Sequence, residues 1–447
     1  MPFAPLILAT DVLLWALVAA AVFYAWYCQR KPHLASPWQR VFRSRAAVIT
    51  SVILAGYTAI GLADSLHFRL KLEGGRAYSP EVLSVLDLAL SGLRERREKT
   101  YSAPLATRLY AREQVELPDG KVSREFPRLR HGGAHLSDES EVFKDILIKG
   151  GIGLLAALIL SSLIFSSTEP LQKRWPDVPW LSAAFTWAAI LAVALPTVVL
   201  STSYHVLGTD KVGQDVLYQA LKSIRVSLAI GTLTTLVLLP LGISLGVMAG
   251  YFRGWIDDAI QYLYTTLNSI PGVLLIAACV LMMQVFVDRH PDWFDTAAQR
   301  ADFRLLVLCA VLGLTSWTGL ARLLRGEALK LSQLEYIQAA HAFGVSDGRI
   351  LGRHILPNVA HIVIITLVMD FSGLVLAEAV LSYVGVGVDP ATTSFGTMIN
   401  AARLEMGREP IVWWSLAAAF AFMFLLVLAA NLFADAVRDG FDPRVRV

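Results

Sequence analysis

The sequence contains about nine predominantly apolar stretches of roughly 20 residues, the length that an α-helix needs to cross a bilayer core of about 30 Å. Only 17% of the residues are charged, whereas a soluble domain carries about a quarter. The sequence therefore predicts an all-α polytopic membrane protein. The expected spans are 5–27, 46–64, 146–166, 180–200, 226–250, 258–286, 303–321, 358–384 and 412–436.

The basic residues between these spans predict the orientation. They lie between the first and second spans, between the seventh and eighth, and in the C-terminal tail. If each span crosses once, all three regions share one side, which the positive-inside rule makes the cytoplasm. The N-terminus is then outside and the C-terminus is cytoplasmic. The residues concerned are Arg30, Lys31, Arg40, Arg43, Arg45, Arg322, Arg325, Lys330, Arg349, Arg353, Arg438, Arg444 and Arg446.

The segment 66–145 is predicted to lie outside the membrane and is the one candidate for a soluble subdomain. Ser79 and Pro80 resemble a helix start, and the Asp-Gly pair in LPDGKVSREF favours a hairpin. His131 and His135 are interpreted as surface residues rather than as a metal pair. The three cysteines show no metal-ligand spacing, and no catalytic set is apparent anywhere in the chain. The basic clusters give no indication of nucleic-acid binding.

The loop 331–358, between the seventh and eighth expected spans, is too ordered for a plain connector. Gly344 suits the positive φ that ends a helix, and Ser346 or Asp347 suits the cap of the next one. Pro357 suits a helix start. The pattern predicts two short helices joined by a tight bend on the cytoplasmic face, with Arg349 and Arg353 exposed. A rigid projection of this kind fits a groove on another protein.

These residues resemble the cytoplasmic coupling signature of ABC importer permeases, which reads Glu-Ala-Ala, three residues, Gly, nine residues, then Ile-x-Leu-Pro. Gln338, Ala339, Ala340 and Gly344 match the first part at the right spacing, and Leu356 and Pro357 close it. The chain departs from the signature at Gln338, in place of the glutamate, and at His354, in place of the first isoleucine. The coupling loop is expected to span 333–357 and to include Arg349.

Four further blocks are similar to the dipeptide, oligopeptide and nickel permease family, in particular its second-permease branch. They are HVLGTDKVGQDVLYQALKSIRVSLAIG, YFRGWIDDAIQYLYTTLNSIPGVLL, LSYVGVGVDPATTSFGTMINAAR and the ending NLFADAVRDGFDPRVR. The resemblance implies a core of the type I importer class over 205–447. Residues 46–67 are expected to be the first core helix, with the fourth span as the alternative. Residues 1–45 form an extra helix with a basic loop, and 68–204 an insertion with two extra helices.

The resemblance implies an import subunit of the bacterial inner membrane that carries peptides, nickel chelates or a related small solute. The implied partners are a second permease, two ATPases and an extracytoplasmic substrate-binding protein. This chain has no Walker A pattern, so ATP and Mg²⁺ belong to the ATPases. An ion-driven secondary transporter is the main alternative, but no internal repeat favours it. A membrane enzyme is a further alternative, for which no motif is found.

Several other residues are candidates for function. Asp370 and Glu378 lie about two turns apart in the eighth span and are candidate pathway residues, with pairing inside the helix bundle as the alternative. Pro271 is expected to kink the sixth span, and Trp413 and Trp414 to anchor at the membrane interface. Asp11 and Lys149 are expected to reach the membrane surface. The candidate outer gate or binding-protein docking residues are Gly208, Thr209, Asp210, Asp215, Pro390, Ser394 and Gly396.

Overall fold

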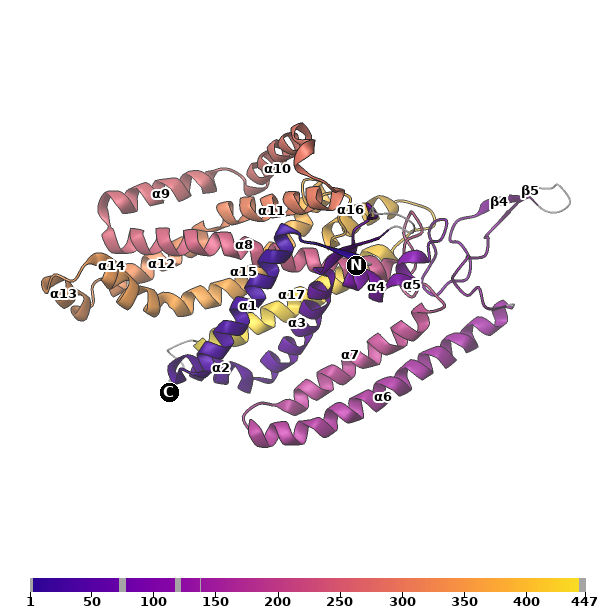
Figure 1. Cartoon of the computed structure of the whole chain (residues 1–447), viewed down its shortest axis with the longest axis horizontal. Helices are drawn as coiled ribbons and strands as arrows, with labels where there is room; N and C mark the ends of the chain where they lie inside the picture. The colour runs from indigo at the N-terminus through magenta and orange to yellow at the C-terminus, as the bar shows by residue number, and fades with distance from the viewer. Residues whose placement is uncertain (1–2, 72–77, 117–121, 137, 442–447) are drawn as a thin grey trace. The chain divides into compact units, whose positions relative to one another are not determined.

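The computed structural model describes residues 3–71, 78–116, 122–136 and 138–441. The chain divides into two compact units, which are described separately below (Figure 1). The first unit consists of residues 1–6, 42–227 and 392–429. The second unit consists of residues 7–41, 228–391 and 430–447.

Among the described residues, nine helical stretches are long and apolar enough to cross a membrane, which confirms the expected number of spans. They are Ala9–Gln29, Arg45–Asp64, Val142–Arg174, Trp180–Ser201, Val216–Phe252, Gly272–Arg289, Ala297–Leu331, Asp347–Val384 and Trp414–Phe441. Several exceed the expected length. The longest helix, Val216–Phe252, has 37 residues, which corresponds to about 55 Å at 1.5 Å per residue.

The first unit combines helices with a few short strands. Its helices are α3 (Arg45–Asp64), α4 (Val85–Ala89), α5 (Ser91–Glu95), η1 (Glu139–Glu141), α6 (Val142–Arg174), α7 (Trp180–Ser201), α16 (Phe395–Glu405) and the first parts of α8 (Val216–Phe252) and α17 (Trp414–Phe441). Its strands are β1 (Phe3–Leu6), β2 (His67–Leu70), β3 (Leu83–Ser84), β4 (Glu113–Glu116) and β5 (Val122–Glu125). Strands β1, β2 and β3 form one antiparallel sheet in that order, with Phe3 opposite Leu70 and His67 opposite Ser84.

The insertion differs from its predicted structure at one helix start. Residues Ser79 and Pro80 do not begin a helix; α4 begins at Val85 instead. Ser84 is its N-cap, and its side chain and that of Asp87 form a reciprocal capping box. The predicted hairpin is confirmed, because β4 and β5 pair antiparallel with Glu113 opposite Glu125. Its Asp-Gly turn lies outside the described residues, as do Arg444 and Arg446.

Helix α3 is hydrogen-bonded to two other helices of the first unit, and its expected role as the first core helix stays a prediction. The Tyr57 hydroxyl donates to the carbonyl of Phe422 in α17 at 2.8 Å. Asp64, at the other end of α3, accepts from Lys222 of α8 at 3.2 Å. Helix α7, in contrast, lies along α6 and packs also on α3 (Figure 1). The boundaries of the core and of the insertion stay predictions.

The second unit is helical throughout its described residues. Its helices are α1 (Ala9–Gln29), α2 (Pro32–Arg43), the remainder of α8, α9 (Gly254–Ser269), α10 (Gly272–Arg289), η2 (Pro291–Trp293), α11 (Ala297–Ser316), α12 (Thr318–Leu331), α13 (Glu335–Ala342), α14 (Asp347–Ile350), η3 (Leu351–Ile355), α15 (Leu356–Val384) and the end of α17. A buried apolar cluster joins α8, α12 and α15.

The expected sixth span, 258–286, is wrong as a single kinked helix. Pro271 separates two helices, because α9 ends at Ser269 and α10 begins at Gly272. The residue before a proline is driven out of the helical region, and Ile270 accordingly has φ −91° and ψ 129°. Of the two helices, only α10 is long and apolar enough to be a span.

Candidate functional site

The bend that follows α13 is closed by a Schellman motif around Gly344. Gly344 has φ +73°, a left-handed conformation that suits glycine. Its N–H donates to the carbonyl of His341 at 2.9 Å, and the N–H of Val345 donates to that of Ala340 at 3.1 Å. This pair of hydrogen bonds satisfies two carbonyls at the end of α13. The predicted positive φ at Gly344 is confirmed.

The structure differs from the prediction beyond the bend. The second short helix is not separate, because α14 runs through a π-helical turn, Leu351–Ile355, into α15. Ser346 occupies the cap position of α14 but makes no side-chain capping bond. We call residues 335–355, which comprise α13, the bend, α14 and the π turn, the bent segment.

Three isoleucines anchor the bent segment in the second unit. Ile337, Ile350 and Ile355 are fully buried in the cluster that contains Leu324 and Val359. Burying such a side chain contributes about 1.5–3 kcal/mol relative to exposing it. The three isoleucines lie on both sides of the bend. The bend is therefore fixed to α8, α12 and α15, which supply most of the other buried residues of the cluster.

A tyrosine at the end of α8 ties the two sides of the bend together. The Tyr251 hydroxyl donates to Asp347 Oδ1 at 2.8 Å, and the oxygen of that hydroxyl lies 2.7 Å from His341 Nε2. The rings of Tyr251 and His341 also stack, with centroids 5.7 Å apart. The one phenol can donate to Asp347 and accept from His341. Sequence reasoning did not identify this contact, because Tyr251 is more than 80 residues away in the chain.

The outward surface of the bent segment is apolar at its tip and basic beside it. Phe343, next to Gly344, is 87% exposed, more than any other large hydrophobic residue described. Arg349 and Arg353 are exposed, as predicted. Gln338 is also exposed, and its Nε2 donates to the carbonyl of Gln333 at 3.1 Å. Sequence reasoning did not single out Phe343, because neither its type nor its spacing distinguishes it from a core residue.

The helices next to the bent segment, α8, α9 and α12, are held together by close backbone packing and an ion pair. A Cβ on Gly250 would lie 2.4 Å from the carbonyl oxygen of Arg325, so α8 and α12 are in backbone contact there. Arg325 donates two hydrogen bonds of 2.6 Å to the carboxylate of Asp257 in α9. These bonds hold the pKa of Asp257 below its usual value, although desolvation opposes the shift. A bidentate pair of this kind fixes orientation as well as charge.

Residues 208–215 form a turn in the first unit in which Gly208, Thr209, Gly213 and Asp215 are buried, whereas Lys211 and Val212 are exposed. Thr209 and Asp215 are fully buried, and Gly208, with φ +72°, lies against the ring of Trp414. The carboxylate of Asp210 accepts from the backbone N–H groups of Val212 and Gln214. Ser394 caps α16 with Thr397; it and Gly396 are buried, whereas Pro390 in the second unit is exposed. The gate or docking role of these residues stays a prediction.

The insertion is fastened to this turn by a buried acid–histidine–acid arrangement. His205 Nδ1 lies 2.8 Å from Asp215 Oδ2. Its Nε2 lies 3.5 Å from Glu98 Oε1, which is long for a hydrogen bond, so that contact is mainly charge attraction. Glu98 also accepts backbone hydrogen bonds from Arg130, His131 and Gly132. Glu98 thereby joins its own segment to residues 130–132 and to His205, all in the first unit.

The surroundings of His205 and Glu98 shift the pKa of each side chain. Burial alone would lower the pKa of His205, but the neighbouring Asp215 and Glu98 carboxylates raise it to about 9. Burial would raise the pKa of Glu98, but the nearby His205 ring and the hydrogen bonds from the three backbone N–H groups lower it to about 2. His205 is therefore charged at neutral pH and lies between the side chains of Asp215 and Glu98.

These shifts predict how stability depends on pH. The stabilisation from His205 is complete below its ordinary pKa of 6.5 and is lost as pH rises through about 9. The stabilisation from Glu98 is complete above 4.5 and is lost as pH falls through about 2. We expect the thermal midpoint of the protein in nanodiscs to fall between pH 6.5 and 9. The variant His205→Gln should have a lower thermal midpoint at pH 6.5, and that midpoint should not fall as pH rises to 9. An equal fall in wild type and variant would contradict the role given to His205.

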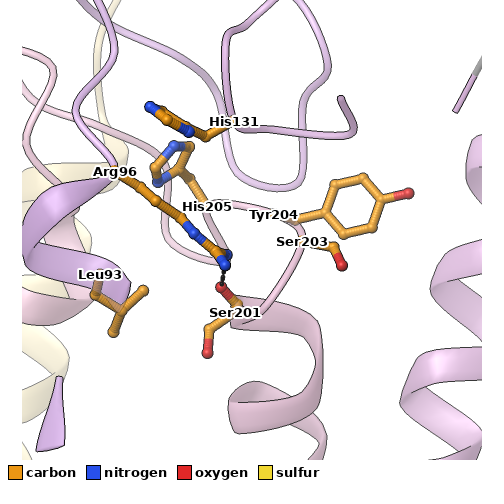
Figure 2. Close-up of a pocket in the computed structure, with 7 residues that line it drawn as sticks. All are labelled: Leu93, Arg96, His131, Ser201, Ser203, Tyr204 and His205. Atoms are coloured by element: carbon orange, nitrogen blue, oxygen red, sulfur yellow. Dashed lines mark hydrogen bonds between the residues drawn. The ribbon is translucent and has the colours of Figure 1, made fainter. Parts of the chain in front are cut away.

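Figure 2 shows the crevice beside His205. Arg96 points toward the end of α7 and donates to the carbonyl of Ser201 at 3.2 Å. The crevice has no space for a water-sized sphere, so it is a joint between segments rather than a ligand site. Its lining residues are Leu93, Arg96, His131, Ser201, Ser203, Tyr204 and His205.

The candidate pathway residues differ in their surroundings. Glu378 is fully buried, and its Oε1 accepts from the Ser382 hydroxyl at 2.7 Å. The same hydroxyl lies 3.4 Å from the N–H of Val388, beyond the end of α15. Glu378 is thus hydrogen-bonded within α15, and its pathway role stays a prediction. Asp370 is half-buried in α15, and its pathway role stays a prediction.

Three smaller predictions need correction. Trp414 is not at an exposed interface: it is 2% exposed, and its Nε1 donates to the carbonyl of Thr209 at 2.9 Å. Asp11 is buried and does not extend to a surface. Lys149 pairs with Asp145 at 2.9 Å instead of extending outward.

The two histidines of the insertion are not a metal pair in the described part of the chain. His135 Nε2 lies 2.8 Å from the carboxylate of Asp145, whereas the backbone of His131 bonds to Glu98. Within the described ranges, no group of three or more His, Cys, Asp or Glu residues is placed to hold a metal ion.

Comparisons with known proteins agree with the resemblance read from the sequence. Residues 242–447 match the family model for the binding-protein-dependent transport system inner membrane component. The glutathione transport system permease protein of Pectobacterium atrosepticum is 35% identical over 247 residues, which cover 55% of this chain and 74% of that protein. The oligopeptide transport system permease protein of Mycobacterium tuberculosis is 31% identical, over 54% of this chain and 77% of that one.

The dipeptide transport system permease protein of Lactococcus lactis is 28% identical over 54% of this chain and 64% of that protein. A solved structure of the MetNI methionine ABC transporter covers half of the chain at 17% identity, with a TM-score of 0.36, which is too low to support an argument. The family match, the nine apolar helices and the glutathione permease relative agree with one another. The chain is therefore a multi-pass inner-membrane transport subunit, and it belongs to the family of binding-protein-dependent transport system inner membrane components.

Proposed function

We propose that this chain is the permease subunit of an ATP-driven importer for peptides or a related small solute. The relatives named above are permeases for glutathione, oligopeptides and dipeptides, which supports this class of cargo. A second permease subunit completes the pathway, and an extracytoplasmic binding protein delivers the cargo. An ion-driven transporter is not favoured by any of the relatives.

Residues 333–357 couple the permease to separate ATPase subunits, which bind ATP and Mg²⁺. The observation that carries this proposal is the bent segment, which exposes Phe343 on a base anchored by Ile337, Ile350 and Ile355. An exposed aromatic residue on a rigid base fits a pocket in a partner. Closure of the ATPases on ATP then moves the segment, and the helices fixed to it move with it.

The orientation from the positive-inside rule supports this assignment. It places the bent segment and the C-terminus in the cytoplasm, where ATP is available. Gln338 has no charge, so an ion pair to the ATPase at this position is excluded. We infer that the contact depends on Phe343, with Arg349 and Arg353 beside it.

The variant Phe343→Ala tests the coupling role. We expect about 30-fold weaker association with the ATPase subunits, because an aromatic hot spot contributes about 2 kcal/mol or more. Substrate-stimulated ATP hydrolysis should fall accordingly. The measurement is the affinity of purified ATPase for the permease in nanodiscs. Trp255→Ala is the matched control, because Trp255 is 78% exposed but lies in α9, outside the bent segment. Equal affinity for Phe343→Ala and wild type would contradict the proposal.

A further inference from the structure

The β-ribbon of the insertion carries arginines on one face. Arg108 and Arg128 are paired across an isolated antiparallel bridge, and Arg124 lies opposite Gln114 in the register of β4 and β5. Residues that are directly opposite share a face, as do alternate residues along one strand. Arg124, Phe126 and Arg128 therefore lie on the same face. We call Arg108, Arg112, Arg124 and Arg128, all exposed, the arginine face.

An aromatic ring lies in the middle of the arginine face. The guanidinium of Arg112 lies over the ring of Phe126, 5.2 Å from its centroid, and Phe126 is 39% exposed. Extended backbone rises roughly 3.3 Å per residue, so Arg124 and Arg128 lie at most about 13 Å apart along the chain. The face is thus an extended strip in which planar cations surround one exposed ring.

Three of the four arginines on this face have no acidic partner among the described residues. Within the described part of the chain, neither Arg112, Arg124 nor Arg128 forms an ion pair, and Arg128 bonds only to the carbonyl of Leu136. Glu113, of neighbouring β4, is engaged by Lys99 at 2.7 Å. The three exposed guanidinium groups of Arg112, Arg124 and Arg128 therefore attract negative charge.

We propose that the arginine face docks an acidic surface of the soluble binding protein. This inference rests on the proposed function, which places the insertion outside the membrane. Arginine with an aromatic residue is the composition of protein interface centres, and guanidinium groups bind carboxylates in pairs. In the first unit, β4 and β5 extend beyond the ends of α6 and α7, which favours a soluble partner over the lipid headgroups (Figure 1).

The test uses the complete transporter in nanodiscs and the purified binding protein of the same system. The Kd of the binding protein is measured for wild type, for Arg112→Glu/Arg124→Glu and for Lys71→Glu/Arg97→Glu. The last variant is the control, because both residues are exposed in the insertion but outside the arginine face. We expect the first variant to weaken binding about tenfold or more, the control to bind as wild type, and wild-type binding to weaken as salt rises.

A second measurement separates the binding protein from lipid. The same nanodiscs are sedimented with phosphatidylglycerol vesicles. Loss of vesicle binding in Arg112→Glu/Arg124→Glu, with unchanged affinity for the binding protein, would overturn the proposal. The proposal would also be overturned if Arg112→Glu/Arg124→Glu and Lys71→Glu/Arg97→Glu weakened the affinity for the binding protein equally. If the ATPases do not associate with the wild-type chain, the proposed function fails. If they associate and are stimulated, but the arginine variant binds as wild type, this inference alone fails.

Discussion

Gly344→Pro is expected to abolish substrate-stimulated ATP hydrolysis while the chain still inserts in the membrane. Gly344 has φ +73°, whereas proline is fixed near −65°. Proline also removes the N–H that donates to the carbonyl of His341. The bend can then no longer form as it stands, and Phe343 loses its position. The spans themselves contain no part of this turn, so insertion should not change.

The control for this prediction lies four residues further along. Gly348 is as open as Gly344, since neither has an atom within 4 Å of an added Cβ. It occupies the first turn of α14, where the helical backbone accepts alanine. Gly348→Ala should therefore keep most of the stimulated hydrolysis, measured with the complete transporter in nanodiscs. Normal stimulation in Gly344→Pro would show that the bend is not the coupling element.

Lys222→Met is expected to destabilise the first unit by about 2–4 kcal/mol, near the range for breaking a buried ion pair. Lys222 Nζ lies 2.6 Å from the carboxylate of Asp87 and 3.2 Å from that of Asp64. Both carboxylates are about 3% exposed, and methionine would leave them facing each other without the cation. Desolvation by burial would raise the pKa of Asp87, but Lys222 holds it below its usual value. The side chain of Lys222 is 24% exposed, so water moderates the loss.

The measurement is the free energy of unfolding in mixed micelles, with the triple variant Lys222→Met/Asp64→Asn/Asp87→Asn as the control. Removing the two charges with the cation should restore much of the lost stability, because no unpaired charge stays buried. If Lys222→Met and the triple variant are equally unstable, the loss comes from packing and not from charge.

Sequence reasoning predicted the features that depend on composition and local backbone chemistry. The nine spans follow from apolar length, and the positive φ of Gly344 follows from residue type. The hairpin at β4 and β5 was likewise predicted. Local patterns failed where two signals competed. Ser79 with Pro80 and Ser84 with Asp87 both resemble helix starts, and the reciprocal cap at Ser84 is the one that forms.

The parts that the sequence did not predict depend on contacts between distant residues. Tyr251 meets His341 and Asp347 only because α8 ends beneath the bend. Trp414 resembles an interface anchor in sequence, yet the carbonyl of Thr209 satisfies its N–H inside the first unit. A single sequence contains no signal for such pairs.

The joint around Glu98 bears on how a chain of this kind can gain or lose residues 68–204. Excising that stretch would remove Glu98 from His205 and Ser102 from Thr209, and it would take Asp87 away from Lys222. Polar groups now sealed from water would be uncovered together. A shorter descendant would therefore need matched replacements at His205, Thr209 and Lys222 in the same step, so the stretch is not a detachable module.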